Sequence, residues 1–128
     1  MNDDEHRYSH DESTEKIIGC AYTVANTLGA GFLEKVYENA LSHELRKQGI
    51  AVAEQSQISV NYDGGVVGEF VADLVVADTV IVELKAVSGG LNDARMAQCL
   101  NYLKATGLKV CLLLNFGRSK VEVKRISL

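Results

Sequence analysis

The spacing of apolar residues predicts two helices in the first 50 residues of the chain. From residue 13 to residue 28, apolar side chains recur at steps of three and four, as they do along one face of a helix. Glycines at 29 and 31 end this pattern, and a second apolar stripe starts near residue 33 and stops at Gly49. The expected inward positions of the first helix are Ile17, Ile18, Ala21, Val24, Ala25 and Leu28. Those of the second helix are Leu33, Val36, Tyr37, Ala40, Leu41 and Leu45.

The middle of the chain is typical of consecutive strands. Segments rich in Val, Ile and Leu predict three strands at about 51–61, 66–76 and 80–87. Their separation by short polar or glycine-containing turns favours neighbouring positions in one sheet.

The last third of the chain predicts one helix and two strands. The helix is expected from about 93 to 106, with Asn92 or Asp93 as its N-terminal cap and Gly107 at its end. Apolar segments at 109–116 and 121–128 complete the element order ααβββαββ. The sequence therefore predicts a single domain of the mixed α+β class over residues 13–128, long enough to bury a core.

Three charges interrupt the apolar segment "ADLVVADTVIVELKAV" at residues 72–87, and their relative positions depend on the turn between the two strands. A two-residue loop at 78–79 would pair Asp73 with Leu84 and place the two carboxylates on opposite faces of the sheet. A three-residue loop at 77–79 pairs Asp73 with Glu83, with their Cβ atoms roughly 5 Å apart. We expect the three-residue loop, and we expect Asp73 to share a sheet face with Val71 and Val75.

Such a pair of carboxylates has a chemical consequence. Two carboxylates at this distance repel each other unless a cation lies between them or one of them is protonated. Lys85, two residues after Glu83 on the same face, can then reach whatever the cation binds.

Glu34 and the pair of Gln98 and Tyr102 are further candidates on the helices. In helical projection Glu34 falls between Leu41 and Leu45, at the edge of the apolar stripe. It either stabilises the helix start through the dipole or points toward the same cation as the strand carboxylates. Gln98 and Tyr102 are four residues apart and share one helix face, which the margin of an amphipathic helix would also explain.

The net charge of −4 is concentrated at one end of the chain. Residues 1–12 hold five acids and one arginine, which accounts for the whole excess, and we expect this segment to be an unstructured acidic tail. Toward the other end, six bases face the single acid Glu122. This excess indicates a possible nucleic-acid-binding surface, although a solvated face also explains it. The candidate bases are Lys104, Arg118, Lys120, Lys124 and Arg125.

Cysteine content and hydropathy exclude several classes of protein. The three cysteines lack CxxC spacing, so we expect buried, reduced thiols and neither a disulfide framework nor a zinc site. No segment approaches the roughly 18 consecutive apolar residues of a membrane span, and the polar N-terminus is unlike a signal peptide. A cytoplasmic protein without membrane contact is therefore expected.

Taken together, the motifs "GFLEKVY", "ADL", "ELK" and "QCLNY" resemble the GxxExxY family, a branch of the PD-(D/E)XK nuclease superfamily. The resemblance rests on Gly31, Glu34 and Tyr37 in the first motif and on Asp73, Glu83, Lys85, Gln98 and Tyr102 in the others. It covers nearly the whole chain and implies a restriction-endonuclease-like core, a mixed sheet flanked by helices. The superfamily's eponymous proline is absent, since Ala72 occupies its position.

The chemistry that the resemblance implies is metal-assisted hydrolysis of phosphodiester bonds. Asp73, Glu83 and the Leu84 backbone carbonyl would bind Mg²⁺ or Mn²⁺, which would lower the pKa of a bound water. Lys85 would orient that water or stabilise the transition state. Glu34 would hold a metal-bound water or a second ion, and Gln98 and Tyr102 would position the metal shell or the substrate.

Two other functions fit the same residues. One is a catalytically silent module that binds nucleic acid or protein, and the other is a structural protein in which the charges form cross-strand ion pairs. A homodimer and a recruiting protein partner are also expected, and the expected nucleic acid is DNA or RNA.

Overall fold

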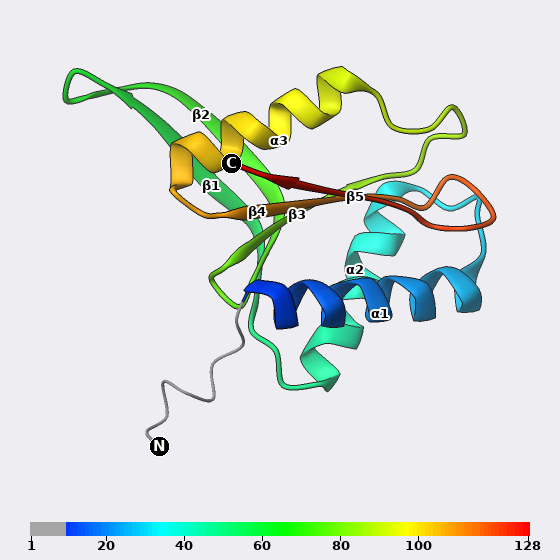
Figure 1. The fold of residues 1–128 in the computed structure, drawn as a ribbon. Helices are drawn as coiled ribbons and strands as arrows, with labels where there is room; N and C mark the ends of the chain where they lie inside the picture. Colours follow the sequence, from blue (N-terminus) through cyan, green and yellow to red (C-terminus); the bar gives the residue numbers. More distant parts are fainter. Residues whose placement is uncertain (1–9) are drawn as a thin grey trace.

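The computed structural model describes residues 10–128, which form three layers (Figure 1). Two helices, α1 (His10–Leu28) and α2 (Glu34–Lys47), cover one face of a sheet, and α3 (Asp93–Thr106) covers the other face. The strands are β1 (Val52–Tyr62), β2 (Gly65–Val76), β3 (Val80–Lys85), β4 (Val110–Asn115) and β5 (Glu122–Ser127). They lie in the order β1-β2-β3-β4-β5. Only the β3–β4 pair is parallel among these described strands. The predicted element order and the mixed α+β class are confirmed.

Two apolar clusters fill the space between the layers. The larger one lies between the sheet and the pair α1 and α2, and it includes Ile17, Ala21, Leu41, Leu45, Leu74, Val82 and Leu112. The smaller one lies under α3 and includes Ile81, Cys99, Leu103, Cys111 and Leu113. All three cysteines are buried and free, as expected.

The helix boundaries follow from local signals in the sequence. Asn92 caps α3 because its side chain accepts a hydrogen bond of 3.0 Å from the Arg95 amide. Gly107 ends the helix at a φ of 77°, a left-handed conformation that glycine adopts without strain. Helix α1 begins at His10, so the expected tail is wrong for residues 10–12, and the rest of it lies outside the described residues.

The apolar stripe of α2 differs from the prediction. Leu33 is 81% exposed and Val36 is 39% exposed, although both were expected to face inward. The helix faces the sheet along a row of residues four apart, Tyr37, Leu41 and Leu45, and Leu33 precedes the first turn of that row. Val36 is rotated by about 100° from Tyr37 and therefore lies beside the row.

Strands β1 and β2 form a long hairpin that extends beyond the rest of the sheet (Figure 1). On β2, Ala72 and Leu74 are two positions apart and should share a face, yet Ala72 packs in the cluster under α3 and Leu74 in the cluster under α1 and α2. Val75, the next residue, contacts the α3 cluster. The alternation of side chains therefore changes phase at Asp73, and the prediction that Val71 shares a face with Asp73 and Val75 is wrong.

Strand β1 changes phase opposite the same point. Val52 packs on the α1/α2 side and Ile58 on the α3 side, although they are six positions apart and a regular strand would place both on one face. Gln55, which lies between them and opposite Asp73, has a left-handed φ of 49°. The bend directs the outer half of the hairpin toward α3 and leaves Asp73 at the bend itself. None of the helices within residues 10–128 is long and apolar enough to cross a membrane.

Candidate active site on strands β2 and β3

The turn between β2 and β3 sets the register of the two carboxylates. Ala77 and Asp78 adopt left-handed conformations with φ of 53° and 56°, and the Thr79 amide donates a 3.0 Å hydrogen bond to the Val76 carbonyl. Pairing resumes between Val76 and Val80, so the connection is the expected three-residue loop. The continuation of this register places Asp73 opposite Glu83.

Each carboxylate accepts a hydrogen bond from the backbone of the opposite strand. Glu83 Oε2 accepts a 2.7 Å bond from the Asp73 amide, and Asp73 Oδ2 accepts a 2.8 Å bond from the Leu84 amide. These two bonds replace ladder bonds where the strands separate and fix the orientation of both side chains. The second oxygen of each carboxylate takes no part in either bond.

Burial and mutual repulsion disfavour two negative charges at this site. Glu83 is only 5% exposed, and its burial, followed by the charge of Asp73, raises its pKa to about 8. Burial also raises the pKa of Asp73, with a further contribution from Glu38, while the Leu84 amide and Lys85 act in the opposite direction. A divalent cation beside the pair would compensate both charges.

Lys85 ends β3 on the same face of the strand as Glu83, and the backbone around it is held firmly. Its carbonyl accepts a 2.8 Å bond from the Phe116 amide. Val87, two residues after Lys85, is held by the buried side chain of Asn115 on β4. This side chain accepts a 2.9 Å bond from the Val87 amide and donates a 2.8 Å bond to the Val87 carbonyl. This clamp fixes the segment that follows Lys85.

Glu38 is the buried carboxylate of α2 beside Asp73, whereas Glu34 is exposed. Glu34 is exposed in the first turn of α2, where its charge suits the helix dipole. Glu38 is 4% exposed and raises the pKa of Asp73. It accepts bonds from Lys35 Nζ at 2.6 Å and from Gln55 Nε2 at 3.0 Å.

The helical periodicity of the sequence contains a signal for the burial of Glu38. In helical projection Glu38 lies about 20° from Leu45, well within the buried side of the helix. It also follows Tyr37 directly and lies one turn after Glu34 on the helix. Neither Glu38 nor its neighbour Lys35 was predicted as a site residue, and the bond from Lys35 to Glu38 raises the pKa of that lysine.

Gln98 and Tyr102 contact each other on α3, as their spacing predicts. Gln98 Nε2 donates a 2.7 Å bond to the Tyr102 hydroxyl. Tyr102 is 3% exposed, and burial, followed by the charge of Glu83, raises its pKa. Tyr102 therefore lies near the carboxylate pair, with Gln98 at the exposed edge.

Gly31 and Tyr37 of the "GFLEKVY" motif have a structural role in the described fold. The Tyr37 hydroxyl donates a 2.6 Å bond to the Gly29 carbonyl and accepts a 3.1 Å bond from the Phe32 amide. Its ring stacks on Phe116 with centroids 4.8 Å apart. Gly31 allows the connection to α2 with a φ of 118°.

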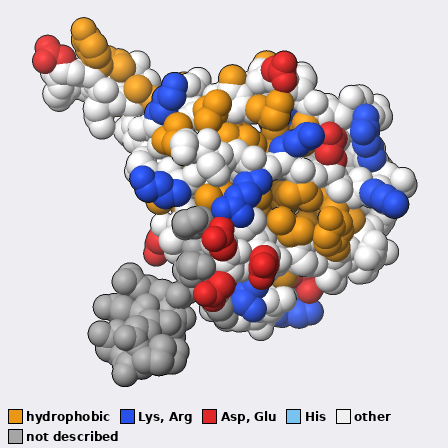
Figure 2. All heavy atoms as spheres, in the orientation of Figure 1, with side chains coloured by type: hydrophobic (Ala, Val, Ile, Leu, Met, Phe, Trp, Pro, Cys, Tyr) orange, Lys and Arg blue, Asp and Glu red, His pale blue; other side chains and the backbone are white. Residues whose placement is uncertain are grey.

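The candidate bases do not form one surface. Arg125 binds Asp11 of α1 at 2.6 Å, Lys120 lies beside α1, and Lys104 is on α3 on the other side of the sheet. Arg118 donates a 3.2 Å bond to the Ser88 carbonyl, and Lys124 is exposed on β5. On the face shown in Figure 2, basic side chains are interspersed with acidic and apolar ones.

The donors at Asp73 and Glu83 fit a hard cation. Within residues 10–128, no group of three or more His, Cys, Asp and Glu side chains could hold a metal ion. Magnesium in proteins commonly uses one or two carboxylates and keeps several waters, and manganese accepts the same oxygen donors. Two neighbouring carboxylates, each held by a backbone amide, match that requirement.

Two solved structures resemble this fold. The crystal structure of SSO0001 aligns with a TM-score of 0.57 at 18% identity, over 91% of this chain and 58% of that chain. The structure of an alkaline exonuclease from Laribacter hongkongensis, LHK-Exo, aligns with a TM-score of 0.50 at 15% identity, over 89% of this chain and 81% of that one. This chain thus spans little more than half of the first of these proteins. At such identities the likeness shows a shared fold. The sequence matches no curated protein.

A family model for the PD-(D/E)XK nuclease superfamily matches residues 11–126, almost the whole described structure. The match spans both strands of the carboxylate pair and the helices on either side of them. The chain belongs to the PD-(D/E)XK nuclease superfamily.

Proposed function

We propose that this protein is a metal-dependent nuclease that hydrolyses phosphodiester bonds of nucleic acid. The observation that carries the proposal is the reciprocal arrangement of Asp73 and Glu83, two carboxylates fixed by opposite strands and unfavourable as a doubly charged pair. Membership of a nuclease superfamily and the fold shared with an alkaline exonuclease support it.

Each side chain of the site has a role in this proposal. A divalent cation, when bound, supplies a Lewis acid that neutralises charge on the phosphate and makes a water more acidic. Asp73 and Glu83 hold the cation, with the Leu84 carbonyl as the predicted third protein ligand. The Lys85 ammonium orients the attacking water and stabilises the negative charge that develops on the phosphoryl oxygens.

The helices complete the site in the proposal. Tyr102 and Gln98 position the substrate or the waters around the cation from the α3 side. Glu38 would orient water beside the cation from the α2 side, a role similar to the one that the resemblance implies for Glu34. Lys35, which is exposed beside Glu38, contacts the phosphate backbone. Among the bases predicted to bind nucleic acid, Lys104 lies on the same side of the sheet as Tyr102.

The decisive experiment compares Lys85→Ala with Lys109→Ala. Lys85 is the last residue of β3, whereas Lys109 directly precedes the parallel strand β4 and is exposed at the opposite end of this pair. Cleavage of single-stranded and duplex oligonucleotides is followed with Mg²⁺, Mn²⁺ or EDTA. We expect Lys85→Ala to retain the melting temperature and lose cleavage by about 100-fold or more, and Lys109→Ala to cleave normally.

Two results would contradict the proposal. Cleavage by Lys85→Ala at the wild-type rate would remove the assigned role of the lysine. Oligonucleotide binding by the wild type that persists in EDTA, without cleavage under any metal, would favour the silent binding module. Membership of the GxxExxY branch, a cytoplasmic location, a homodimer and a recruiting partner stay predictions from the sequence.

A further inference from the structure

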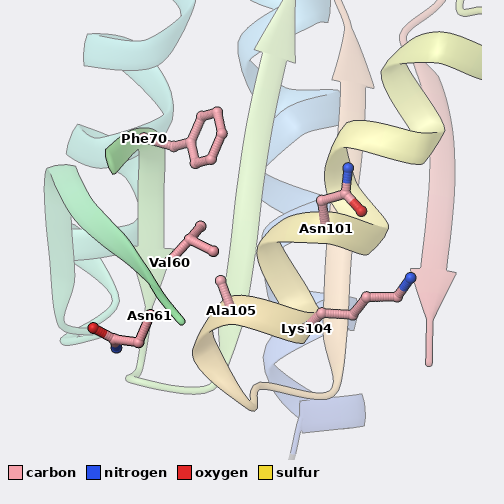
Figure 3. Close-up of a pocket in the computed structure, with 6 residues that line it drawn as sticks. All are labelled: Val60, Asn61, Phe70, Asn101, Lys104 and Ala105. Atoms are coloured by element: carbon pink, nitrogen blue, oxygen red, sulfur yellow. The ribbon is translucent and has the colours of Figure 1, made fainter. Parts of the chain in front are cut away.

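A cavity of about 450 Å³ lies between the β1–β2 hairpin and α3 (Figure 3). The hairpin contributes Val60, Asn61 and Phe70, and the helix contributes Asn101, Lys104 and Ala105. The bend of the hairpin at Asp73 brings these two walls together. Of these six residues, Lys104 alone has a part in the proposed hydrolysis, as a candidate phosphate contact.

Two aromatic rings, Phe70 and Tyr102, lie between the cavity and the carboxylate pair. Phe70 lies three residues before Asp73, and its ring contacts Tyr102 with centroids 5.6 Å apart and planes tilted by 51°. Tyr102 in turn lies within electrostatic reach of Glu83. The cavity is therefore bordered by a ring that contacts the tyrosine beside the carboxylate pair.

Phe70 has the properties of a stacking platform. One side of its ring is supported by Tyr102, yet the side chain remains 44% exposed at the cavity. The exposed part of the ring is therefore available to a ligand that enters the cavity. Flat aromatic ligands stack on such rings, and nucleobases do so in proteins that bind single strands.

The polar residues of the cavity match the other parts of a nucleotide. Asn101 and Lys104 are exposed on α3, and Ala105 lies one turn after Asn101 on the same helix side. The Asn101 amide can both donate and accept hydrogen bonds, as the edge of a base requires. Lys104 supplies a flexible cation suited to a phosphate.

From this arrangement we propose that the cavity receives one unstacked nucleobase of the substrate, next to the bond that is cleaved. Phe70 stacks on the base, Asn101 contacts its edge and Lys104 binds a neighbouring phosphate. A paired base cannot enter without leaving its stack, which is unfavourable. The preferred substrate is therefore single-stranded nucleic acid or the frayed end of a duplex. This inference rests on the proposed nuclease function.

The test measures binding in a Lys85→Ala background with Mg²⁺, so that the oligonucleotide stays intact. The probes are a DNA single strand carrying one 2-aminopurine, its blunt duplex and an RNA strand of the same sequence. Fluorescence of 2-aminopurine rises when the base leaves its stack. We expect this rise on binding of a single strand and weaker binding of the duplex, while comparison of DNA with RNA identifies the preferred sugar.

Phe70→Ala is compared with Val71→Ala, the neighbouring residue, which is 45% exposed and does not line the cavity. We expect Phe70→Ala to weaken single-strand binding about 5- to 150-fold, the range for loss of one base stack, and Val71→Ala to change it little. Asn101→Ala, an exposed substitution that leaves the core intact, should change the preference for the base in the cavity.

Equal losses in Phe70→Ala and Val71→Ala, or equal affinity for single strand and duplex, would overturn the inference. If the wild type still cleaves in a metal-dependent way, the nuclease function then stands without the base site. Conversely, Phe70-dependent binding in a protein that never cleaves would support the base site and reject the nuclease function.

Discussion

The two faces of β3 have opposite compositions. Val80, Val82 and Leu84 point toward α1 and α2 and are almost completely buried. On the α3 face Ile81 is followed by Glu83 and then by Lys85, which is partly exposed. The first face contributes burial, which stabilises the fold, and the second places charges where burial is unfavourable.

The charged face of β3 lowers the stability of the fold, whereas the apolar face raises it. A buried carboxylate with a pKa of about 8 next to a second carboxylate destabilises the folded chain as the pH rises from about 4.5 to about 8. Natural sequences keep such an arrangement mainly where a ligand or a reaction requires it. Substitutions on the charged face should therefore impair metal binding and cleavage with little loss of stability. Substitutions on the apolar face should lower stability and leave metal binding unchanged.

The largest effect is expected for Asp73→Asn on the charged face. The amide keeps an acceptor for the Leu84 amide but loses the charge that a cation needs. We expect calorimetric titration with Mg²⁺ or Mn²⁺ to show no binding and cleavage to fall by about 100-fold or more, without loss of thermal stability. Asp78→Asn, an exposed acid in the adjacent turn, is the control and should behave as the wild type. Metal binding retained in Asp73→Asn would exclude this site.

Leu112→Ala should give the opposite result, because Leu112 lies on the neighbouring strand β4 and packs in the same cluster as the apolar face of β3. Leu112 is completely buried in the cluster under α1 and α2, so truncation leaves a cavity. We expect a loss of about 2–5 kcal/mol in the free energy of unfolding, measured in urea. Metal affinity below the unfolding transition should be unchanged. A large loss of metal affinity would mean that the two faces do not act independently.

The third expected effect is a pH dependence of stability that belongs to Glu83. Its pKa rises from an ordinary value of 4.5 to about 8 on folding, so between these values the folded protein holds a proton that the unfolded chain lacks. Raising the pH across this window therefore destabilises the metal-free protein, by at most about 1.4 kcal/mol per pH unit. Melting temperatures in EDTA should fall from pH 5 to pH 8.

Glu83→Gln supplies the control, because it cannot lose a proton. Its stability should exceed that of the wild type most at pH 8, and the difference should shrink toward pH 5. Saturating Mg²⁺ should reduce the slope of the wild type, since the cation competes with the proton. Identical slopes in both proteins with EDTA would contradict the assigned pKa.

Much of this architecture could be predicted because its signals are local. The α3 boundaries follow from Asn92 and Gly107, and the three-residue loop at 77–79 sets the register of Asp73 and Glu83. Periodicity also predicted that Gln98 and Tyr102 would meet. In each case neighbouring residues determine the geometry, so no knowledge of the tertiary structure is required.

The errors concern features that depend on packing between distant elements. The alternation of side chains changes at Gln55 and Asp73 because the two halves of the hairpin pack against different helices. The half near Leu74 packs in the cluster under α1 and α2, and the half near Ala72 packs in the cluster under α3. The direction of α2 depends on how Tyr37 fits against Phe116. Likewise, the bases near the end of the chain alternate along β5, so Arg125 reaches Asp11 on α1.

The smallest effect should come from Glu38, the α2 carboxylate whose charge raises the pKa of Asp73. Glu38→Gln keeps the contacts to Lys35 and Gln55 in outline but removes a negative charge, which should lower the pKa of Asp73 and weaken cation attraction. We expect Mg²⁺ affinity to fall a few-fold, consistent with a charge that acts without occupying the strand pair. The matched substitution Glu34→Gln, one turn earlier and exposed, should leave the affinity unchanged. If Glu34→Gln gave the larger loss, the structural assignment of Glu38 would be wrong and the expectation from the sequence would be right.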